Sequence, residues 1–323
     1  MLKVKELGIL LIIILIFAIA AVLEPRFFSA ANLRNILLYI PLITVVAMGQ
    51  MMIILSRNVD LSVGSSLGFT GIIVGMIFVQ NIHFPIWLAI ILSIVIGAIL
   101  GAFNGVLVAW LKLPAIIATL GTLNIYRGLL FIYSGGRQVD PHFIPVDLIR
   151  LSQSQYGPLG IPWLVYIAAA VVIVTMLFLT RTRTGREIYA VGSNPEAAKM
   201  RGINVNKILF LVFVLTGAGA GLAGIMYASR FGYVNPGITG LGFEFVVITA
   251  VIVGGTSIFG GSGSVIGTLL GCILIGVINT ALAVLGISTF WQQATYGFFI
   301  IVALVTDKAI QSRIYSVLKR GAA

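Results

Sequence analysis

Ionisable side chains are scarce in this chain, so the few that lie beside its apolar segments are informative. Only 9% of the 323 residues are charged, whereas 59% are hydrophobic. Arg57 and Asp60 flank Asn58 between two apolar runs, Glu244 begins a later run, and Asp307 follows the last one. Charged groups within a membrane are costly, and they often mark solute paths or helix ends. Asp60 therefore has two equal interpretations: it caps the following helix, or it takes part directly in moving a solute.

Residue patterns typical of catalysis and of metal binding do not occur. The two histidines, His83 and His142, stand far from each other, and Cys272 is the only cysteine, which excludes an intrachain disulfide. The glycine-rich stretch at 254–264, "GGTSIFGGSGS", lacks the lysine of a phosphate-binding loop. No series of acidic or histidine residues crosses the apolar segments, so a proton relay is poorly supported. We expect a protein that is not an enzyme, binds no metal or cofactor and does not itself hydrolyse ATP.

The elements that position these residues are membrane spans. The mean hydropathy is +1.13, and apolar runs of spanning length recur from end to end. We predict an all-α, polytopic membrane protein with a single domain over residues 1–323 and about ten transmembrane helices. The predicted spans are 7–23, 36–55, 61–79, 84–109, 115–134, 163–180, 208–229, 243–260, 263–283 and 288–306. The first is too long for the core of a cleaved signal peptide, and we interpret it as a span.

The distribution of Lys and Arg predicts the orientation. With a cytoplasmic N-terminus, fourteen fall on the inside and six, Arg127 among them, on the outside. Both termini are then cytoplasmic, as are a loop at about 181–207 and a basic tail at 307–323. The longest outer loop is 135–162, with a short surface helix expected near 145–151. The net charge of +11 is thereby explained by membrane topology and lipid contact, without a nucleic acid partner.

Two clusters of glycine and serine exceed what close helix packing requires. They are "NVDLSVGSSLG" at 58–68 and the stretch at 254–264, each at a junction between spans. Such composition predicts broken or re-entrant helices, which persist in a membrane only against protein or a water-filled cavity. We assign the candidate translocation path and gate to residues of these clusters: Asn58, Asp60, Ser62, Gly64, Ser65, Gly255, Thr256 and Ser257.

The stretch "GSNPEAAKMRGINVNK", at 192–207, is unusually polar for this chain. Asn194 is a suitable N-cap, Pro195 fits the first helical position, and Glu196 lies at the positive end of the helix dipole. Gly202 supplies the C-terminal stop. The sequence therefore predicts a helix of about two turns, which is too short to be stable alone in water.

This short helix must dock onto something. Its apolar residues, Ala197 and Ala198, offer too little surface for binding in the membrane interface. A face of small residues flanked by charges fits a protein groove better, and we expect the helix to bind a protein partner.

These residues resemble a known family. "EAAKMRG", at 196–202, is similar to the EAA-three-residues-Gly pattern of ATP-binding-cassette importer permeases, and nearly the whole chain resembles the ribose-type sugar permeases. "NVDLSVGS", "VGGTSIFGGSGSVIGTLLGCILIGVINTAL" and "LGISTFWQ" follow that family, although Arg57 and Asn58 stand where many members have Gly-Gly. "AMGQMMIILSRNVDLSVG" and "LGTLNIYRGLLFIYSGG" look most like the branch that imports rhamnose or autoinducer-2.

The resemblance implies a type II importer-like fold in a bacterial inner membrane. It implies two cytoplasmic ATPase subunits, which bind the ATP, and a coupling helix formed by Asn194, Pro195, Glu196, Ala197, Ala198 and Gly202. It further implies an extracytoplasmic binding protein that delivers a small sugar, such as rhamnose, ribose or autoinducer-2, and a second permease copy or a similar subunit. A self-sufficient, ion-coupled secondary sugar transporter is the alternative, but it requires mid-membrane carboxylates that are almost absent here. A channel or membrane anchor would leave the capped helix unexplained.

Overall fold

The chain folds as a bundle of helices, seen in a computed structural model that describes residues 4–321. This part contains no strand, only an isolated bridge between Val139 and Val234. The α-helices are α1 (Val4–Leu23), α2 (Ala30–Leu55), α3 (Val63–Gln80), α4 (Ile86–Ala109), α5 (Ala115–Ser134), α6 (Val146–Arg150), α7 (Trp163–Arg181), α8 (Arg183–Ser193), α9 (Pro195–Met200), α10 (Val205–Phe231), α11 (Phe243–Val253), α12 (Val265–Val284) and α13 (Thr289–Gly321). Short 3-10 turns are η1 (Pro25–Phe28), η2 (Pro141–Phe143), η3 (Ser154–Tyr156) and η4 (Pro158–Gly160).

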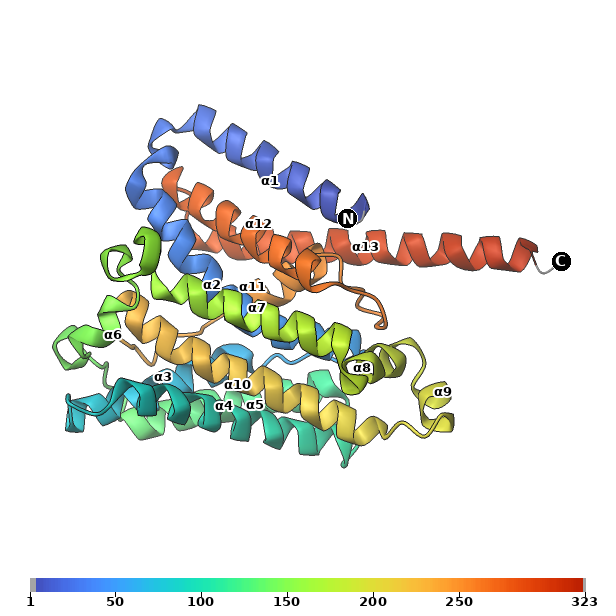
Figure 1. The fold of residues 1–323 in the computed structure, drawn as a ribbon, viewed down its shortest axis with the longest axis horizontal. Coiled ribbons are helices and arrows are strands. Elements are labelled where there is room, and N and C mark those ends of the chain that lie inside the picture. Colours follow the sequence, from blue (N-terminus) through green and yellow to red (C-terminus); the bar gives the residue numbers. More distant parts are fainter. Residues whose placement is uncertain (1–3, 322–323) are drawn as a thin grey trace.

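Each of the ten predicted apolar segments contains a helix. Within the described residues, eight helices are long and apolar enough to cross a membrane, and α11 and the apolar part of α13 are shorter. The chain is thus a multi-pass membrane protein. α2 is the central helix, with 83% of its most apolar window buried, and it packs against α7, α10, α11 and α12. In Figure 1, α3, α4 and α5 lie on one side of this centre, and α1, α12 and α13 lie on the other.

Glycines allow the most extensive helix contact in the described part of the bundle, that between α4 and α10. A Cβ atom on Gly97 would lie only 2.2 Å from the carbonyl oxygen of Gly217, and one on Gly221 only 2.1 Å from that of Ser93. The Ser93 hydroxyl donates a hydrogen bond of 2.5 Å to the Gly221 carbonyl. The glycines at four-residue spacing therefore serve close packing, as small residues do between membrane helices.

The two ends of the bundle differ in what they carry. α9 lies at the end toward which both described chain ends point, whereas α6 lies at the opposite end (Figure 1). α6 is the short helix expected near 145–151, and it starts one residue later, at Val146. The predicted inner loop at 181–207 is helical over most of its length because α8 and α9 occupy it.

The prediction for the eighth span was wrong in its bounds. α11 ends at Val253, eleven residues after it begins, so the helix does not extend to residue 260. The rest of this crossing is the non-helical segment 232–242, which re-enters the bundle along α3. Val234 pairs with Val139, and a Cβ on Gly64 would lie 2.3 Å from the Gly240 carbonyl oxygen. Gly232, Gly240 and Gly242 have positive φ angles, which let this segment turn.

Arg127 supports the re-entrant segment and does not belong to an outer loop. It lies within α5, and its Nη1 donates to the carbonyl oxygens of Thr239 at 2.8 Å and Pro236 at 3.4 Å. A non-helical backbone inside a membrane bundle leaves carbonyls without helical partners, and the guanidinium satisfies two of them. Arg127 therefore has to be removed from the outer count of positive residues.

A candidate coupling helix and the junction behind it

The predicted N-terminal cap of the coupling helix is present. α9 comprises Pro195–Met200, and the side-chain oxygen of Asn194 accepts a hydrogen bond of 3.0 Å from the Ala197 backbone N–H. Pro195 occupies the first helical position, where its lack of an N–H does no harm. Glu196 lies in the first turn, close to the positive end of the helix dipole.

The C-terminus of α9 ends in a Schellman motif. Gly202 has a φ of 80°, and its N–H donates to the Lys199 carbonyl at 2.9 Å. The Ile203 N–H donates to the Ala198 carbonyl at 3.1 Å. These two hydrogen bonds satisfy carbonyls that the helix end would otherwise leave free, and they require the left-handed conformation that glycine adopts most easily. Both ends of this short helix are thus fixed by local hydrogen bonds.

The two alanines do not form one outward face, contrary to the expectation from sequence. Ala198 is buried, whereas Ala197 and Glu196 are exposed and Met200 is 88% exposed. Ala198 packs toward α8 and α10, the two helices that α9 contacts. The surface of α9 offered to a partner therefore comprises Glu196, Ala197, Lys199 and Met200, while Ala198 anchors the helix to its own chain.

Arg57 joins α2 to the segment that carries α9. Its Nε donates to the Gly192 carbonyl at 2.5 Å, and its Nη2 donates to the Ser193 carbonyl at 2.6 Å. These carbonyls belong to the last turn of α8, directly before Asn194. A cation is favoured at a helix C-terminus, where free carbonyls and the helix dipole present negative charge. The end of α2 and the start of α9 are therefore connected through one side chain.

The glycine-rich loop at 254–264 packs into the same junction. The Gly261 N–H donates to the Leu55 carbonyl at 2.9 Å, and the Tyr189 hydroxyl of α8 donates to the Gly263 carbonyl at 3.2 Å. Burial raises the pKa of Tyr189, which keeps this hydroxyl protonated and able to donate. A Cβ on Gly192 would lie 1.7 Å from the Leu55 carbonyl oxygen, so only glycine permits this approach.

The loop is also attached to α1. The Ser264 hydroxyl donates to Oε1 of Glu6 at 2.7 Å and accepts from the Gly267 N–H at 2.9 Å, so that Ser264 caps α12. Between α8 and this loop lies a polar cavity of about 310 Å³, lined in part by Glu6, Tyr189 and Gly255. We name the contacts of Arg57, Gly192, Ser193 and the 254–264 loop the coupling junction.

Asp60 forms a different, fully buried network. Its Oδ1 accepts from the backbone N–H and the hydroxyl of Ser62, both at 2.7 Å. Asn104 of α4 donates through Nδ2 to the Ser62 hydroxyl at 2.8 Å and to Oδ2 of Asp60 at 3.5 Å. Since α3 begins at Val63, the carboxylate binds the N–H directly before the first helical residue. Ser62 is the N-cap residue of α3 and makes no side-chain capping hydrogen bond, so Asp60 fixes the turn before α3 and does not cap the N–H groups of the helix itself. Asn104 joins this turn to α4, as intramembrane amides usually join neighbouring segments.

The structure separates the two groups of predicted path residues. Asp60, Ser62, Gly64 and Ser65 are buried where the start of α3 meets α4, α5 and the re-entrant segment. The other group, Gly255, Thr256 and Ser257, lies in the loop of the coupling junction and not beside Asp60. Gly255 has a φ of 88°, and Thr256 is buried against Thr268. The Ser257 N–H donates to the Ser262 carbonyl. Asn58, which donates to the Ser56 carbonyl at 2.8 Å, lies between the two groups.

Arg57 is the site residue that sequence reasoning missed. The sequence offered two signals: Arg57 is one of the few charged residues beside a span, and it replaces a glycine common in the resembled family. The structure explains why glycine is common at this position, because the φ of Arg57 is 65°, a conformation that glycine adopts without strain. It explains the arginine of this chain by the hydrogen bonds of its guanidinium to α8. No group of three or more His, Cys, Asp or Glu side chains that suits a metal ion occurs among the described residues.

Comparison with known proteins gives one family and a set of close relatives. A family described as the permease component of the branched-chain amino acid transport system matches residues 32–304. The autoinducer 2 import system permease protein LsrC of Escherichia coli O9:H4 (strain HS) is 35% identical over 317 residues, covering 98% of this chain and 90% of the relative. The protein of the same name from Salmonella paratyphi B (strain ATCC BAA-1250 / SPB7) is 34% identical over 316 residues, covering 98% and 89%.

No solved structure matches the chain. The relatives are named as transport permeases and not as enzymes, in agreement with the missing catalytic patterns. The family description and the names of the relatives refer to different solutes, so family membership alone does not assign one.

Proposed function

Because the chain belongs to this family of transport permease components, we propose that it is the membrane subunit of an ATP-binding-cassette importer for a small sugar. The observation that carries the proposal is α9, a helix capped at both ends that exposes Met200 and Glu196 and is fixed to the bundle behind it. Such a helix is a rigid, protruding element that can dock into a groove on a partner ATPase. The name of the relatives, autoinducer 2 import permeases, supports a role in import and makes autoinducer-2 a candidate solute.

The coupling junction can transmit a displacement of α9 to the membrane-spanning helices. ATP binding closes two ATPase subunits and displaces the α9 helices docked on them. Arg57 then transmits this displacement from the end of α8 to the end of α2, next to the start of α3. The buried network at Asp60, together with the re-entrant segment 232–242, forms the gate at the junction of α3, α4 and α5.

The complete transporter comprises two permease copies, or this chain with a similar subunit, and an extracytoplasmic binding protein that delivers the solute. We place it in a bacterial inner membrane with both termini cytoplasmic. Once Arg127 is excluded, the outer side retains five Lys and Arg residues against fourteen inside. The end of the bundle that carries α9 then faces the cytoplasm, and α6 faces outward.

Reconstitution into liposomes tests the proposal against an ion-coupled secondary transporter. The subunit alone is expected to move no solute, with or without an ion gradient. Addition of a cognate ATPase and a cognate binding protein, together with ATP, is expected to start uptake of one of L-rhamnose, D-ribose or autoinducer-2. L-leucine is included because the family description names branched-chain amino acids. Gradient-driven uptake by the subunit alone would contradict the proposal, and uptake of leucine only would contradict the sugar assignment.

A further inference from the structure

An arginine with an unused hydrogen-bond donor lies at the far end of the bundle from α9. Arg230 is in the last turn of α10, and its guanidinium carbon lies 5.0 Å from the ring centroid of Tyr39 and 4.8 Å from that of Phe231. Its Nη1 atom is buried and has no hydrogen-bond partner, and no carboxylate pairs with it among the described residues. The ring faces hold the cation in place while leaving a donor free.

Tyr39 connects this arginine to two further helices. The Tyr39 side chain interacts with the side chains of Asn279 on α12 and Tyr296 on α13. Tyr296 is only 5% exposed, and Tyr39, Arg230 and Asn279 are partly buried. Four helices therefore bring two phenols, an amide and a guanidinium to one place. We name these residues, Tyr39, Arg230, Asn279 and Tyr296, the outer polar cluster.

The cluster lies well away from the coupling junction. Tyr39 precedes Leu55, the last residue of α2, by sixteen residues, which corresponds to about 24 Å along a helix. α10 begins near α9 and runs toward the α6 end, where Arg230 completes its last turn (Figure 1). In the orientation proposed above, this is the half of the bundle that a solute reaches first.

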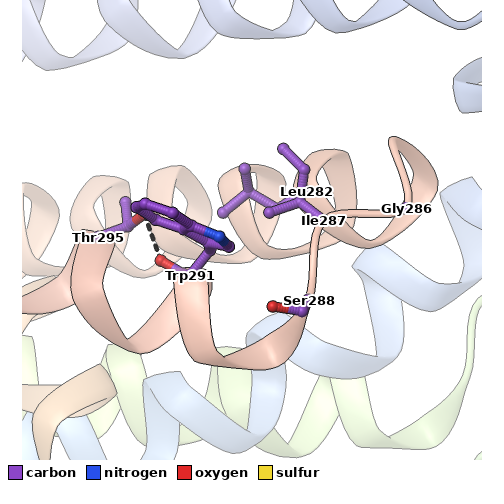
Figure 2. A pocket seen from close by; sticks show the side chains of 6 residues that line it. All are labelled: Leu282, Gly286, Ile287, Ser288, Trp291 and Thr295. Atoms are coloured by element: carbon purple, nitrogen blue, oxygen red, sulfur yellow. Dashed lines mark hydrogen bonds between the residues drawn. The ribbon is translucent and has the colours of Figure 1, made fainter.

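An open pocket of about 580 Å³ adjoins the same two helices, α12 and α13. Its lining comprises the Trp291 indole, the hydroxyl-bearing side chains of Ser288 and Thr295, Leu282 at the end of α12, and Gly286 and Ile287 of the turn (Figure 2). Asn279 lies one helical turn before the lining residue Leu282, and Tyr296 directly follows Thr295. The pocket has the size of a small-molecule site and combines an aromatic face with hydroxyl groups.

A second unused polar group lies deeper on the same face of α2. Gln50 follows Tyr39 by eleven residues, about three helical turns, so both side chains leave the helix in nearly the same direction. Gln50 is fully buried, and neither its Nε2 nor its Oε1 has a hydrogen-bond partner. Buried amides are nearly always hydrogen-bonded in folded proteins, so Gln50 offers a donor and an acceptor inside the bundle that a hydroxylated ligand can pair with.

We propose that the outer polar cluster is a solute-contact site on the permease itself, with Gln50 as the next contact inward. The exposed Trp291 indole of the adjoining pocket stacks against the C–H face of a sugar ring, while the guanidinium and amide groups of the cluster hydrogen-bond its hydroxyls. The positive charge of Arg230 excludes cationic solutes. The site therefore takes a neutral, polyhydroxylated solute of monosaccharide size, and this assignment rests on the proposed function.

Two substitutions test the site in the reconstituted transporter. Arg230→Gln removes the charge and the free donor, and Tyr39→Phe removes only the hydroxyl while keeping the ring under Arg230. Both are expected to lower the amount of solute moved per ATP by about fivefold or more, the size expected for one lost hydrogen bond. ATP hydrolysis stimulated by the loaded binding protein should stay close to wild type, since α9 is unchanged. Arg150→Gln on α6 and Tyr133→Phe on α5, both exposed, are the matched controls.

The outcomes separate the site from a structural role and from a wrong solute class. Unchanged solute per ATP in both variants, or a parallel loss of ATP hydrolysis and uptake, overturns the solute-contact site. If Arg230→Gln fails to assemble, Tyr39→Phe decides alone, since it preserves the aromatic contact. If the wild-type complex moves none of L-rhamnose, D-ribose and autoinducer-2, the proposed function fails first, and the site assignment falls with it.

Discussion

At the scale of single residues, Arg57 combines a strained backbone with a structural connection. A non-glycine residue at a φ of 65° costs about 1 kcal/mol or more. Hydrogen bonds from its guanidinium to the Gly192 and Ser193 carbonyls offset that cost. Glycine at this position would relieve the backbone strain but would lose the hydrogen bonds to the end of α8. Both residue types therefore allow the positive φ angle, and only arginine connects α2 to α8.

Substitution of Arg57 is therefore expected to separate strain from connection. Arg57→Ala keeps the strain and loses both hydrogen bonds, so we expect a loss of about 1–2 kcal/mol in stability together with reduced uptake. Arg57→Gly should be more stable than Arg57→Ala but equally impaired in uptake. Thermal unfolding of the purified subunit and ATP-driven uptake measure the two effects. Wild-type uptake by Arg57→Ala would show that the motion of α9 does not pass through this side chain.

Asp60 is expected to act as a hydrogen-bond acceptor at the start of α3. Asn in its place can still accept from the Ser62 N–H, so Asp60→Asn should retain substantial uptake. Asp60→Leu leaves the buried N–H and hydroxyl of Ser62 without their acceptor, and should abolish uptake and lower expression. Uptake measured in parallel for both variants checks this. Equal and complete loss would identify the negative charge itself as essential.

At the scale of elements, α9 is too short to be stable by itself and depends on its caps and on Ala198. The Asn194 cap, the Schellman hydrogen bonds and the buried Ala198 together fix the orientation of Glu196 and Met200. Loosening either end should therefore impair docking while leaving the spans intact.

Two changes to α9 are expected to uncouple the transporter. Gly202→Val places a β-branched residue at a φ of 80°, and Glu196→Lys puts a positive charge at the positive helix end. Both variants should remain in the membrane yet lose most ATP-driven uptake and bind the ATPase more weakly, as measured by co-purification. Gly202→Asn is the control for the first, because asparagine tolerates the left-handed conformation and no atom lies within 4 Å of the added Cβ. Normal uptake with both changes would reject α9 as the docking element.

At the scale of the whole molecule, the bundle has two chemically different ends. α8, α9 and the coupling junction lie at one end, and α6 lies at the other (Figure 1). A reporter fused at residue 190, within α8, should therefore be cytoplasmic, whereas one fused at residue 150, at the end of α6, should be extracytoplasmic. The same orientation can be measured independently by introducing a cysteine at residue 150 or 190 and testing whether a membrane-impermeant thiol reagent labels it from outside. The reverse result would overturn the orientation derived from the positive residues.

The sequence by itself determined the spans, the caps of α9 and the class of protein. These features depend on short-range rules: hydrophobic runs match the membrane thickness, and Asn194 and Gly202 act on backbone groups within a few residues. Only the tertiary structure decided that Ala198 faces inward, that segment 232–242 completes a crossing without a helix, and that Arg57 binds carbonyls 135 and 136 residues away. Such contacts join segments whose separation leaves no periodicity in the sequence, because they depend on which helices pack together. The outer polar cluster has the same origin, since its four residues come from four helices.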